Sequence, residues 1–284
     1  MPEGDTLART AAGLRPHLTG RTVTAARARS GVQAGRLVGS TVESVEARGK
    51  NLLIRTSNGL EVRTHLRMTG TWHRYRPGEP WRRPASRAVF VLEVPGAVAV
   101  CFDAPVVEIF EARAEAIHPT LANLGPDLLD HDFDAAEALR RLRSPTRAGV
   151  SMGEALLDQR ALAGIGNVYR SEVLFIERVD PFATVAALDD EVLGRLVATA
   201  RRLLRANADR RRGPERTTTG GDPAAGGAAL WVYGQAGRPC RHCGTAIRAA
   251  TVGRDLPRTL WWCPACQAPP KSESAAGARP AAGG

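Results

Sequence analysis

The sequence predicts an α+β protein in which a β-rich first part is followed by a helical part and then by a compact cysteine-rich unit. Between about residues 21 and 109, short apolar segments alternate with turns rich in Gly, Pro, Asn and Arg. After Gly125-Pro126, apolar residues recur at helical spacing instead. Four of the five cysteines then lie between Cys240 and Cys266. A chain of 284 residues is long enough for one large domain or two modest ones.

A single amphipathic helix is expected at the start of the chain. Asp5 is its expected N-cap, and the apolar residues that follow at helical spacing are Leu7, Ala11, Leu14 and Leu18. Short strands are expected next, over residues 41–47, 52–56, 60–66, 89–94 and 98–102. Strands of this length and spacing predict a β-sandwich or a β-barrel, with an exposed loop over the Pro- and Arg-rich residues 78–87.

The second part of the chain is predicted to be helical. Helices are expected over residues 133–142, 153–162, 168–177 and 189–206. The second and third of these are joined by residues 163–167, a turn that contains two glycines. A loop over residues 210–227 then leads to the cysteine-rich unit. Residues 267–284 have low complexity and are expected to be disordered.

The net charge of the chain indicates which classes of partner it binds. The formal net charge is +10, which favours a polyanion, although charge alone does not distinguish DNA, RNA and an acidic membrane. No segment reaches the ~20 apolar residues that span a bilayer, and residues 1–18 lack the apolar run of a secretory signal. We therefore expect a cytoplasmic protein that makes no contact with a membrane.

Lysine occurs at only two positions, Lys50 and Lys271, in a chain that otherwise uses arginine for positive charge. An internal lysine can give up a proton, which arginine cannot. Composition alone favours chance retention, and the turn Arg48-Gly49-Lys50-Asn51 also fits a solvent-exposed hairpin lysine. In the functional interpretation, the Lys50 ammonium lies at a nucleic-acid phosphate or near a reacting sugar.

The four clustered cysteines predict a metal site. Cys240-x2-Cys243 and Cys263-x2-Cys266 are separated by nineteen residues, which is within the range of zinc-binding thiolate pairs. Two disulfides are the alternative, but an intracellular chain favours zinc. Because four protein ligands leave no open coordination position, we expect one structural Zn2+. The arginines of this unit fit either nucleic-acid phosphates or a solvated charged face.

The N-terminal residues carry a possible nucleophile. Removal of Met1 would leave Pro2 with a free secondary amine, whose pKa near ~8 allows a neutral fraction at cellular pH. Such an amine attacks an aldehyde-like carbon to form a Schiff base. Glu3 beside it is suited to protonate a sugar oxygen or to shuttle a proton. Taken alone, the segment fits a frayed and inert terminus better.

Two further segments are ambiguous when each is taken alone. Met68 follows a predicted strand, where it either tucks into the core or acts as a wedge that fills the gap left by a flipped base. In the second interpretation, Arg67 hydrogen-bonds the orphaned partner base. The two-glycine turn before Asn167 exposes helix N-terminal amides to an anion such as a DNA phosphate. Spacing alone favours an ordinary turn in which Asn167 is the N-cap.

The order of these segments is more specific than any one of them. From the N-terminus they are Met-Pro-Glu-Gly, Arg-Gly-Lys-Asn-Leu-Leu, His-Leu-Arg-Met-Thr-Gly, Asn-Leu-Gly-Pro-Asp-Leu-Leu, residues 156–172 and the four-cysteine unit. In this order they resemble the formamidopyrimidine-DNA glycosylase/endonuclease VIII family, from residue 2 to about 268. The resemblance implies two domains with DNA in the cleft between them. The first is a β-sandwich flanked by a helix, and the second is a helical domain with a helix–two-turn–helix motif and a zinc finger.

The resemblance also implies roles for individual residues. Pro2 corresponds to the Schiff-base nucleophile and Glu3 to the acid/base that assists base loss and ring opening. Lys50 corresponds to the hairpin lysine that contacts the lesion phosphates and takes part in the proton step of β-elimination. Asn167 and Arg258 correspond to a phosphate clamp, and Arg258 is also assigned to δ-elimination.

Details of the sequence indicate a branch of the family. Gly4 resembles the endonuclease VIII branch, and Asp5-Thr6 resembles an actinobacterial variety of it. Met68 resembles the intercalating wedge. Residues 104–108 stand where purine-directed members place two further wedge residues, an Arg and a Phe, so the complete set of three is absent.

The resulting hypothesis is a monomeric, nucleoid-associated DNA glycosylase/AP lyase that removes oxidised pyrimidines from damaged DNA and cuts the strand by β,δ-elimination. The expected domains are a catalytic β-sandwich (1–125), a helix–two-turn–helix domain (126–228), a zinc finger (229–268) and a disordered tail (269–284). Three alternatives stay open at this point. They are a glycosylase for 8-oxoguanine or formamidopyrimidine lesions, an enzyme that is chiefly an AP lyase, and a non-catalytic zinc-finger protein that binds damaged DNA.

Overall fold

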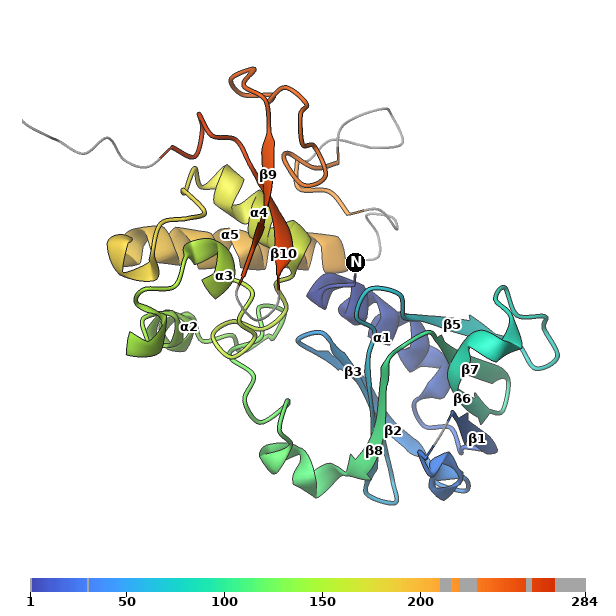
Figure 1. Ribbon diagram of the computed structural model, residues 1–284. Helices are drawn as coiled ribbons and strands as arrows, with labels where there is room; N and C mark the ends of the chain where they lie inside the picture. Colours follow the sequence, from blue (N-terminus) through green and yellow to red (C-terminus); the bar gives the residue numbers. More distant parts are fainter. Residues whose placement is uncertain (1, 30, 210–215, 220–228, 254–256, 269–284) are drawn as a thin grey trace, which may run out of the picture.

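The computed structural model describes residues 2–29, 31–209, 216–219, 229–253 and 257–268. A β-sandwich lies beside a helical domain that carries a small two-stranded hairpin (Figure 1). A long connection that includes the 3-10 helix Ala112–Ile117 links them. The predicted two-domain α+β class is confirmed. The domain boundaries stay predictions, and the tail over residues 269–284 lies outside the described residues.

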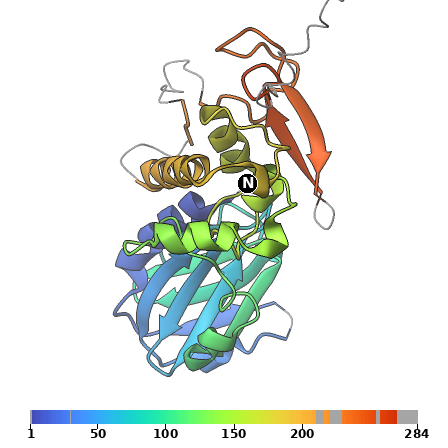
Figure 2. The same ribbon diagram turned by 90° about the vertical axis from the view of Figure 1, so that its left-hand side faces the viewer.

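The sandwich consists of two four-stranded antiparallel sheets. The strand order of the first sheet is β1 (Ala25–Ala28), β6 (Ala88–Val94), β7 (Ala97–Phe102) and β5 (Thr71–Tyr75). The strand order of the second sheet is β2 (Val42–Arg48), β3 (Asn51–Thr56), β4 (Leu60–His65) and β8 (Val106–Glu111). The main apolar core lies between these sheets, which lie below the helical domain in Figure 2. The chain therefore forms the sandwich and not the barrel.

The sequence pattern did not predict β1, β5 and β8. β1 reads Ala-Ala-Arg-Ala, which has low strand propensity, and it is extended because it pairs with β6. β8 is a strand because it pairs with β4, with Val106 opposite His65. These strands depend on partners that are distant in sequence, so local periodicity did not reveal them.

The first helix, α1 (Gly4–Leu18), covers the sheet that contains β2 and β3. Its four expected apolar residues are buried in the core of the sandwich. The prediction that Asp5 is the N-cap is wrong, because the helix begins at Gly4 and Glu3 occupies the N-cap position. The carboxylates of Glu3 and Asp5 are instead bound by the helical domain.

The helical domain contains α2 (Ala135–Leu142), α3 (Met152–Ala155), α4 (Asn167–Ile176) and α5 (Asp190–Ala208). The 3-10 helices Pro145–Arg147 and Val185–Ala187 also belong to this domain, whereas the 3-10 helices Ala34–Leu37 and Ala85–Arg87 lie between strands of the sandwich. The helix predicted over residues 153–162 is too long, because the chain makes two turns between α3 and α4. Asp158 caps one turn through the N–H of Arg160 (2.9 Å), and the Gln159 amide donates to the Ile165 carbonyl (2.9 Å).

The two-stranded hairpin consists of β9 (Arg248–Val252) and β10 (Arg258–Trp262) and packs on α4. The segment that precedes this hairpin is held by a buried carboxylate on α4, that of Glu172. This carboxylate accepts hydrogen bonds of 2.8 Å from three consecutive backbone N–H groups, those of Trp231, Val232 and Tyr233. No helix among the described residues combines the length and apolar character that crossing a bilayer requires.

Candidate active site at the junction of the two domains

The side chain of Glu3 is completely buried where the two domains meet. Its carboxylate accepts hydrogen bonds from the backbone N–H groups of Gly166 (2.7 Å) and Val168 (2.8 Å) at the start of α4. The first N–H groups of a helix lack partners within the helix and lie at the positive end of its dipole, so they bind anions. The interpretation that these amides face a DNA phosphate is therefore wrong for Gly166 and Val168. The anion that they bind is Glu3.

Glycines make this close approach possible. Gly4 donates its N–H to the Gly164 carbonyl (2.9 Å), and a Cβ on Gly4 would lie 3.0 Å from the Gly164 Cα. A Cβ on Gly166 would lie 2.4 Å from the Glu3 Cδ. Gly166 is thus explained by the chain terminus that docks on it, whereas Gly164 has a φ of +105°, which favours glycine. Pro2, directly before Glu3, is half-buried at this junction.

Lys50 lies in the turn between β2 and β3 and faces the same junction. Gly49, which has a φ of +58°, donates its N–H to Asp127 of the helical domain (2.5 Å) and so anchors the turn. The pKa of Lys50 is lowered to about 8, chiefly by burial. The negative charge of Glu3 opposes the shift, and three nearby cations add to it, namely Arg258, Arg170 and Arg216.

The predicted clamp residues Asn167 and Arg258 lie on neighbouring elements. Asn167 is the first residue of α4, and its amide donates to the carbonyl of Thr259 in β10 (2.8 Å). Arg170 donates to the same carbonyl (2.9 Å). Arg258, adjacent to Thr259, is exposed. Gly166 and not Asn167 occupies the N-cap position, so Asn167 is instead a link between the helical domain and the hairpin that carries Arg258.

The predicted wedge residue Met68 lies in the loop between β4 and β5. It is 61% exposed and does not tuck into the core. Arg67 beside it is also exposed and has a left-handed backbone, with a φ of +46°. At the base of this loop, burial and the charge of Lys50 lower the pKa of His65 to about 4. The loop therefore begins near Lys50 and presents two exposed side chains at its tip.

The four predicted metal ligands come together in the structure. All four Sγ atoms lie within 4.8 Å of one another, with 3.8 Å between Cys240 and Cys266 and 3.5 Å between Cys243 and Cys263. None of the four forms a disulfide. Tetrahedral zinc with Zn–S bonds of ~2.3 Å places its sulfurs ~3.8 Å apart. The cysteine geometry therefore fits a closed zinc site, and Cys101 lies apart from it in the sandwich core.

The structure adds residues that the sequence analysis missed. Asp5 is completely buried, and Arg216 donates to both of its oxygens, from Nε (3.0 Å) and from Nη2 (2.5 Å). Arg216 Nη1 also lies 3.8 Å from Glu3 Oε1. Arg216 follows a run of arginines that composition assigns to a loop, so no local signal singles it out. The resemblance of Asp5-Thr6 to an actinobacterial variety of the family was the only indication that Asp5 has a special role.

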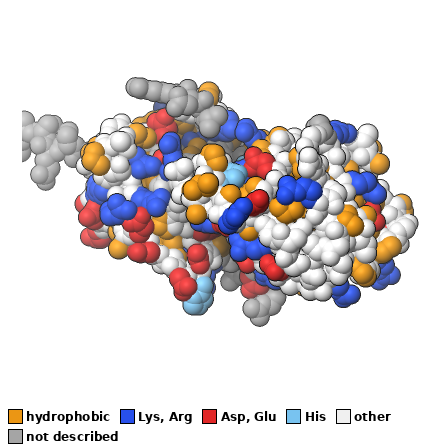
Figure 3. All heavy atoms as spheres, turned by 90° about the horizontal axis from the view of Figure 1, so that it is seen from below, with side chains coloured by type: hydrophobic (Ala, Val, Ile, Leu, Met, Phe, Trp, Pro, Cys, Tyr) orange, Lys and Arg blue, Asp and Glu red, His pale blue; other side chains and the backbone are white. Residues whose placement is uncertain are grey.

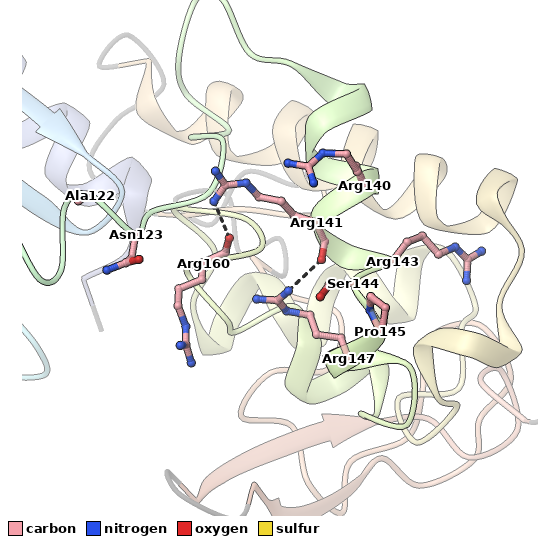
Figure 4. A pocket seen from close by; sticks show the side chains of 9 residues that line it. All are labelled: Ala122, Asn123, Arg140, Arg141, Arg143, Ser144, Pro145, Arg147 and Arg160. Carbon is pink, nitrogen blue, oxygen red and sulfur yellow. Dashed lines mark hydrogen bonds between the residues drawn. The ribbon is translucent and has the colours of Figure 1, made fainter. Parts of the chain in front are cut away.

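A basic hollow, separate from the junction, lies on the helical domain beside the connection between the domains (Figure 4). Five of its nine lining residues are arginines, namely Arg140, Arg141, Arg143, Arg147 and Arg160. Each pairs with a carboxylate, as Arg143 does with Asp190. These arginines hold the helices and turns together. In the view from below, basic side chains lie on both domains with acidic ones among them (Figure 3).

The class of protein follows from comparing both domains with known families. The formamidopyrimidine-DNA glycosylase N-terminal domain matches residues 1–105, and the formamidopyrimidine-DNA glycosylase H2TH domain matches residues 124–218. These matches cover more than half of the chain. The chain therefore belongs to the formamidopyrimidine-DNA glycosylase family, whose members are DNA glycosylases and AP lyases of base excision repair.

Individual relatives cover nearly the whole chain. It is 44% identical to the probable endonuclease 8 2 of Streptomyces coelicolor in an alignment of 278 residues that covers 95% of this chain and 95% of that protein. It is 40% identical to the DNA-(apurinic or apyrimidinic site) lyase Nei2 of Mycolicibacterium smegmatis, with 94% of this chain and 99% of that protein covered. The Lactococcus lactis Fpg in complex with abasic-site DNA has the same fold, with a TM-score of 0.77 at 22% identity over 94% of this chain and 100% of that chain.

Gly166→Ala should disable the site without unfolding the protein. The added Cβ would meet the Glu3 Cδ at 2.4 Å, so the carboxylate has to leave the N–H groups that bind it. We expect cleavage of abasic-site DNA to fall by at least about 100-fold, because small displacements of reacting groups have effects of this size. The measurement is a single-turnover rate at saturating enzyme.

Gly194→Ala is the matched control for this substitution. Gly194 lies inside α5, and its Cβ would meet no atom within 4 Å. This variant should keep full activity and gain about 0.5–1 kcal/mol of stability from the better helix former. A Gly166→Ala protein that cleaves as fast as the control would show that the Glu3 contact does not matter for activity.

Proposed function

We propose that this chain is a bifunctional DNA glycosylase/AP lyase that removes oxidised bases, chiefly pyrimidines, and then cuts the strand by β,δ-elimination. The observation that carries the proposal is the meeting of Pro2-Glu3 with Lys50 in one buried junction. Relatives at 40–44% identity bear endonuclease 8 or AP lyase names, whereas the compared formamidopyrimidine-DNA glycosylases reach 30–34%. This difference supports the endonuclease VIII branch over the purine-lesion alternative.

The chemistry begins at the chain terminus. Once Met1 is removed, the Pro2 nitrogen attacks C1′ of the flipped nucleotide, loses its proton, and the bond from C1′ to the base breaks. The C1′–O4′ bond then breaks as O4′ takes up a proton and the sugar ring opens, and an iminium forms between Pro2 and C1′. The iminium withdraws electrons and acidifies the C2′ proton. Loss of that proton breaks the C3′–O bond, and a second elimination breaks the C5′–O bond, so a phosphate leaves on each side. Hydrolysis of the iminium then frees Pro2.

The proton steps are assigned to Glu3 and Lys50. Glu3 is next to the nucleophile and protonates or shuttles a proton at the sugar oxygen during base loss. A pKa of about 8 leaves part of the Lys50 population neutral near pH 7, so that it can accept the C2′ proton. Arg258 contacts the phosphate that leaves in δ-elimination. A non-catalytic DNA-binding protein would not require a buried, anchored carboxylate beside its terminus, which favours the enzyme.

The DNA contacts involve exposed residues around this junction. Arg258 and the adjoining Asn167 bind the backbone phosphates next to the lesion. The exposure of Met68 supports its insertion into the base stack, with Arg67 at the orphaned base. Because one chain supplies every residue of this site, we infer that it acts as a monomer on damaged DNA in the nucleoid of the cytoplasm.

One zinc ion is proposed for the four cysteines. The residues Cys240, Cys243, Cys263 and Cys266 would hold it, and it would supply structure and no reaction step, since four thiolates close its coordination sphere. The ion would fix the β9–β10 hairpin and, through it, the position of Arg258.

Borohydride should trap a covalent adduct between the protein and damaged DNA, because it reduces the iminium to a stable amine. An uncleaved N-terminal tag that masks Pro2 should abolish both the adduct and strand cleavage, whereas the same tag at the C-terminus should leave both intact. Substrates with oxidised thymine, oxidised cytosine, 8-oxoguanine or a bare abasic site then separate the lesion classes. Trapping that persists with a masked terminus rules out Pro2.

The rate of strand cleavage should rise with pH until about pH 8, where Lys50 loses its proton. A terminal amine also titrates near ~8, so log kcat/KM should rise with a slope of about two below this pH. In Lys50→Arg the side chain stays charged, and the slope should fall to about one. The check is a pH profile on abasic-site DNA at constant ionic strength. An unchanged slope in the variant would remove Lys50 from the proton step.

Zinc removal should weaken DNA binding. Purified protein should contain about one zinc per chain by mass spectrometry of the metal, and Cys263→Ser should lose it together with most of its DNA affinity. The matched control is Cys101→Ser, a thiol outside the cluster, which should keep its zinc. Full DNA affinity in the zinc-free protein would contradict the structural role of the ion.

A further inference from the structure

A buried ion pair joins the two domains directly behind the N-terminus. The Asp5 carboxylate is completely buried on the first turn of α1, and the Arg216 side chain of the helical domain is 13% exposed. Nε and Nη2 of Arg216 each donate to one carboxylate oxygen, which is the two-pronged geometry that arginine and not lysine provides. Because burying two charges is costly, a pair of this kind is weak evidence of stability and points to a positional role.

Arg216 also contacts the other residues around the terminus. Its Nη1 lies 3.8 Å from Glu3 Oε1, and its Nη2 donates to the Thr6 hydroxyl (3.1 Å). The guanidinium lies over the ring of Tyr169, 4.9 Å from its centre, and Tyr169 belongs to the first turn of α4. One side chain therefore touches the start of α1 and the helix that binds Glu3.

These contacts hold the terminus at three successive residues. Glu3 is bound by the N–H groups of α4, and Gly4 is hydrogen-bonded to Gly164. Asp5 is bound by Arg216. Glu3 and Gly4 bind the turn before α4 and the start of that helix, whereas Asp5 is bound by a side chain from the segment after α5. The third contact therefore attaches the backbone that follows Pro2 to a second segment of the helical domain.

We propose that Arg216, through Asp5, is a positioning residue that fixes the Pro2 nitrogen for attack and so speeds the covalent step without adding affinity for DNA. This inference rests on the proposed Pro2 chemistry. Arg216 does not itself react, and its effect acts through the backbone of residues 2–5. The pairing also gives a role to Asp5-Thr6, because Arg216 contacts both residues.

The test is chemical rescue of Arg216→Ala. At saturating enzyme, the single-turnover rate of borohydride-trappable adduct formation on abasic-site DNA should fall by about 100-fold, while the Kd for a non-cleavable abasic analogue stays within about threefold. Guanidinium at millimolar concentration should restore much of the rate by refilling the site beside Asp5. The same concentration of NaCl should not. A merely structural role for Arg216 would not give rescue that is specific to guanidinium.

Arg143→Ala is the matched control. Arg143 also pairs with a carboxylate, that of Asp190, and donates to two backbone carbonyls, but it is the C-cap residue of α2 and lies apart from the terminus. Its adduct rate should not respond to guanidinium. If Arg216→Ala does not fold, the variant Asp5→Asn tests the proposal instead, because it keeps the shape of the Asp5 side chain and removes the ion pair with Arg216. This variant should be slow at unchanged Kd and not be rescued.

The outcomes separate the two proposals. Wild-type protein that forms no trapped adduct would overturn the Pro2 chemistry and this inference with it. Wild-type trapping together with wild-type rates in Asp5→Asn, or in a folded Arg216→Ala, would overturn only the role of Arg216. The role of Arg216 would also be overturned if Arg216→Ala weakened DNA binding (a higher Kd) without slowing adduct formation, or if NaCl restored the rate as well as guanidinium does.

Discussion

The binding of the Glu3 carboxylate by the first N–H groups of α4 is the contact on which the rest of the site depends. A carboxylate is tolerated in a protein interior only when its oxygens are hydrogen-bonded, and here helix amides supply the donors. Because Glu3 is the second residue after the initiator methionine, satisfying it also brings Pro2 to the junction. The requirement extends into the sequence as glycines at positions 4 and 166, where a side chain would push the terminus away.

The charges around this carboxylate explain the state of Lys50. Three arginines converge on the junction from α4, from the hairpin and from the segment after α5, and together with burial they outweigh Glu3 and lower the pKa of Lys50 to about 8. The same excess of cations suits a polyanion. Phosphates of bound DNA would oppose the arginines and favour the charged form of Lys50.

Local sequence signals predicted the parts of the molecule whose contacts are local. Helix periodicity and cysteine spacing predicted the helices and the metal cluster, and the strand pattern predicted a sandwich or a barrel. The order of the motifs identified the family and, through it, the sandwich. Contacts between distant segments were not accessible in this way. Asp5 looked like an N-cap because that is its commonest role near a helix start, whereas its partner Arg216 lies 211 residues away. Likewise, β1 is a strand only through its pairing with β6.

Two carboxylates bind across the junction in opposite directions. Glu3 of the sandwich domain binds backbone N–H groups of the helical domain, and Asp127 of the helical domain binds the backbone N–H of Gly49 beside Lys50. Pro2 and Lys50 are thus both positioned by contacts of their neighbours, Glu3 and Gly49, with the helical domain. Loss of either contact would change the separation of Pro2 and Lys50 while leaving each domain folded. The placement of the two domains therefore sets the geometry of the proposed site.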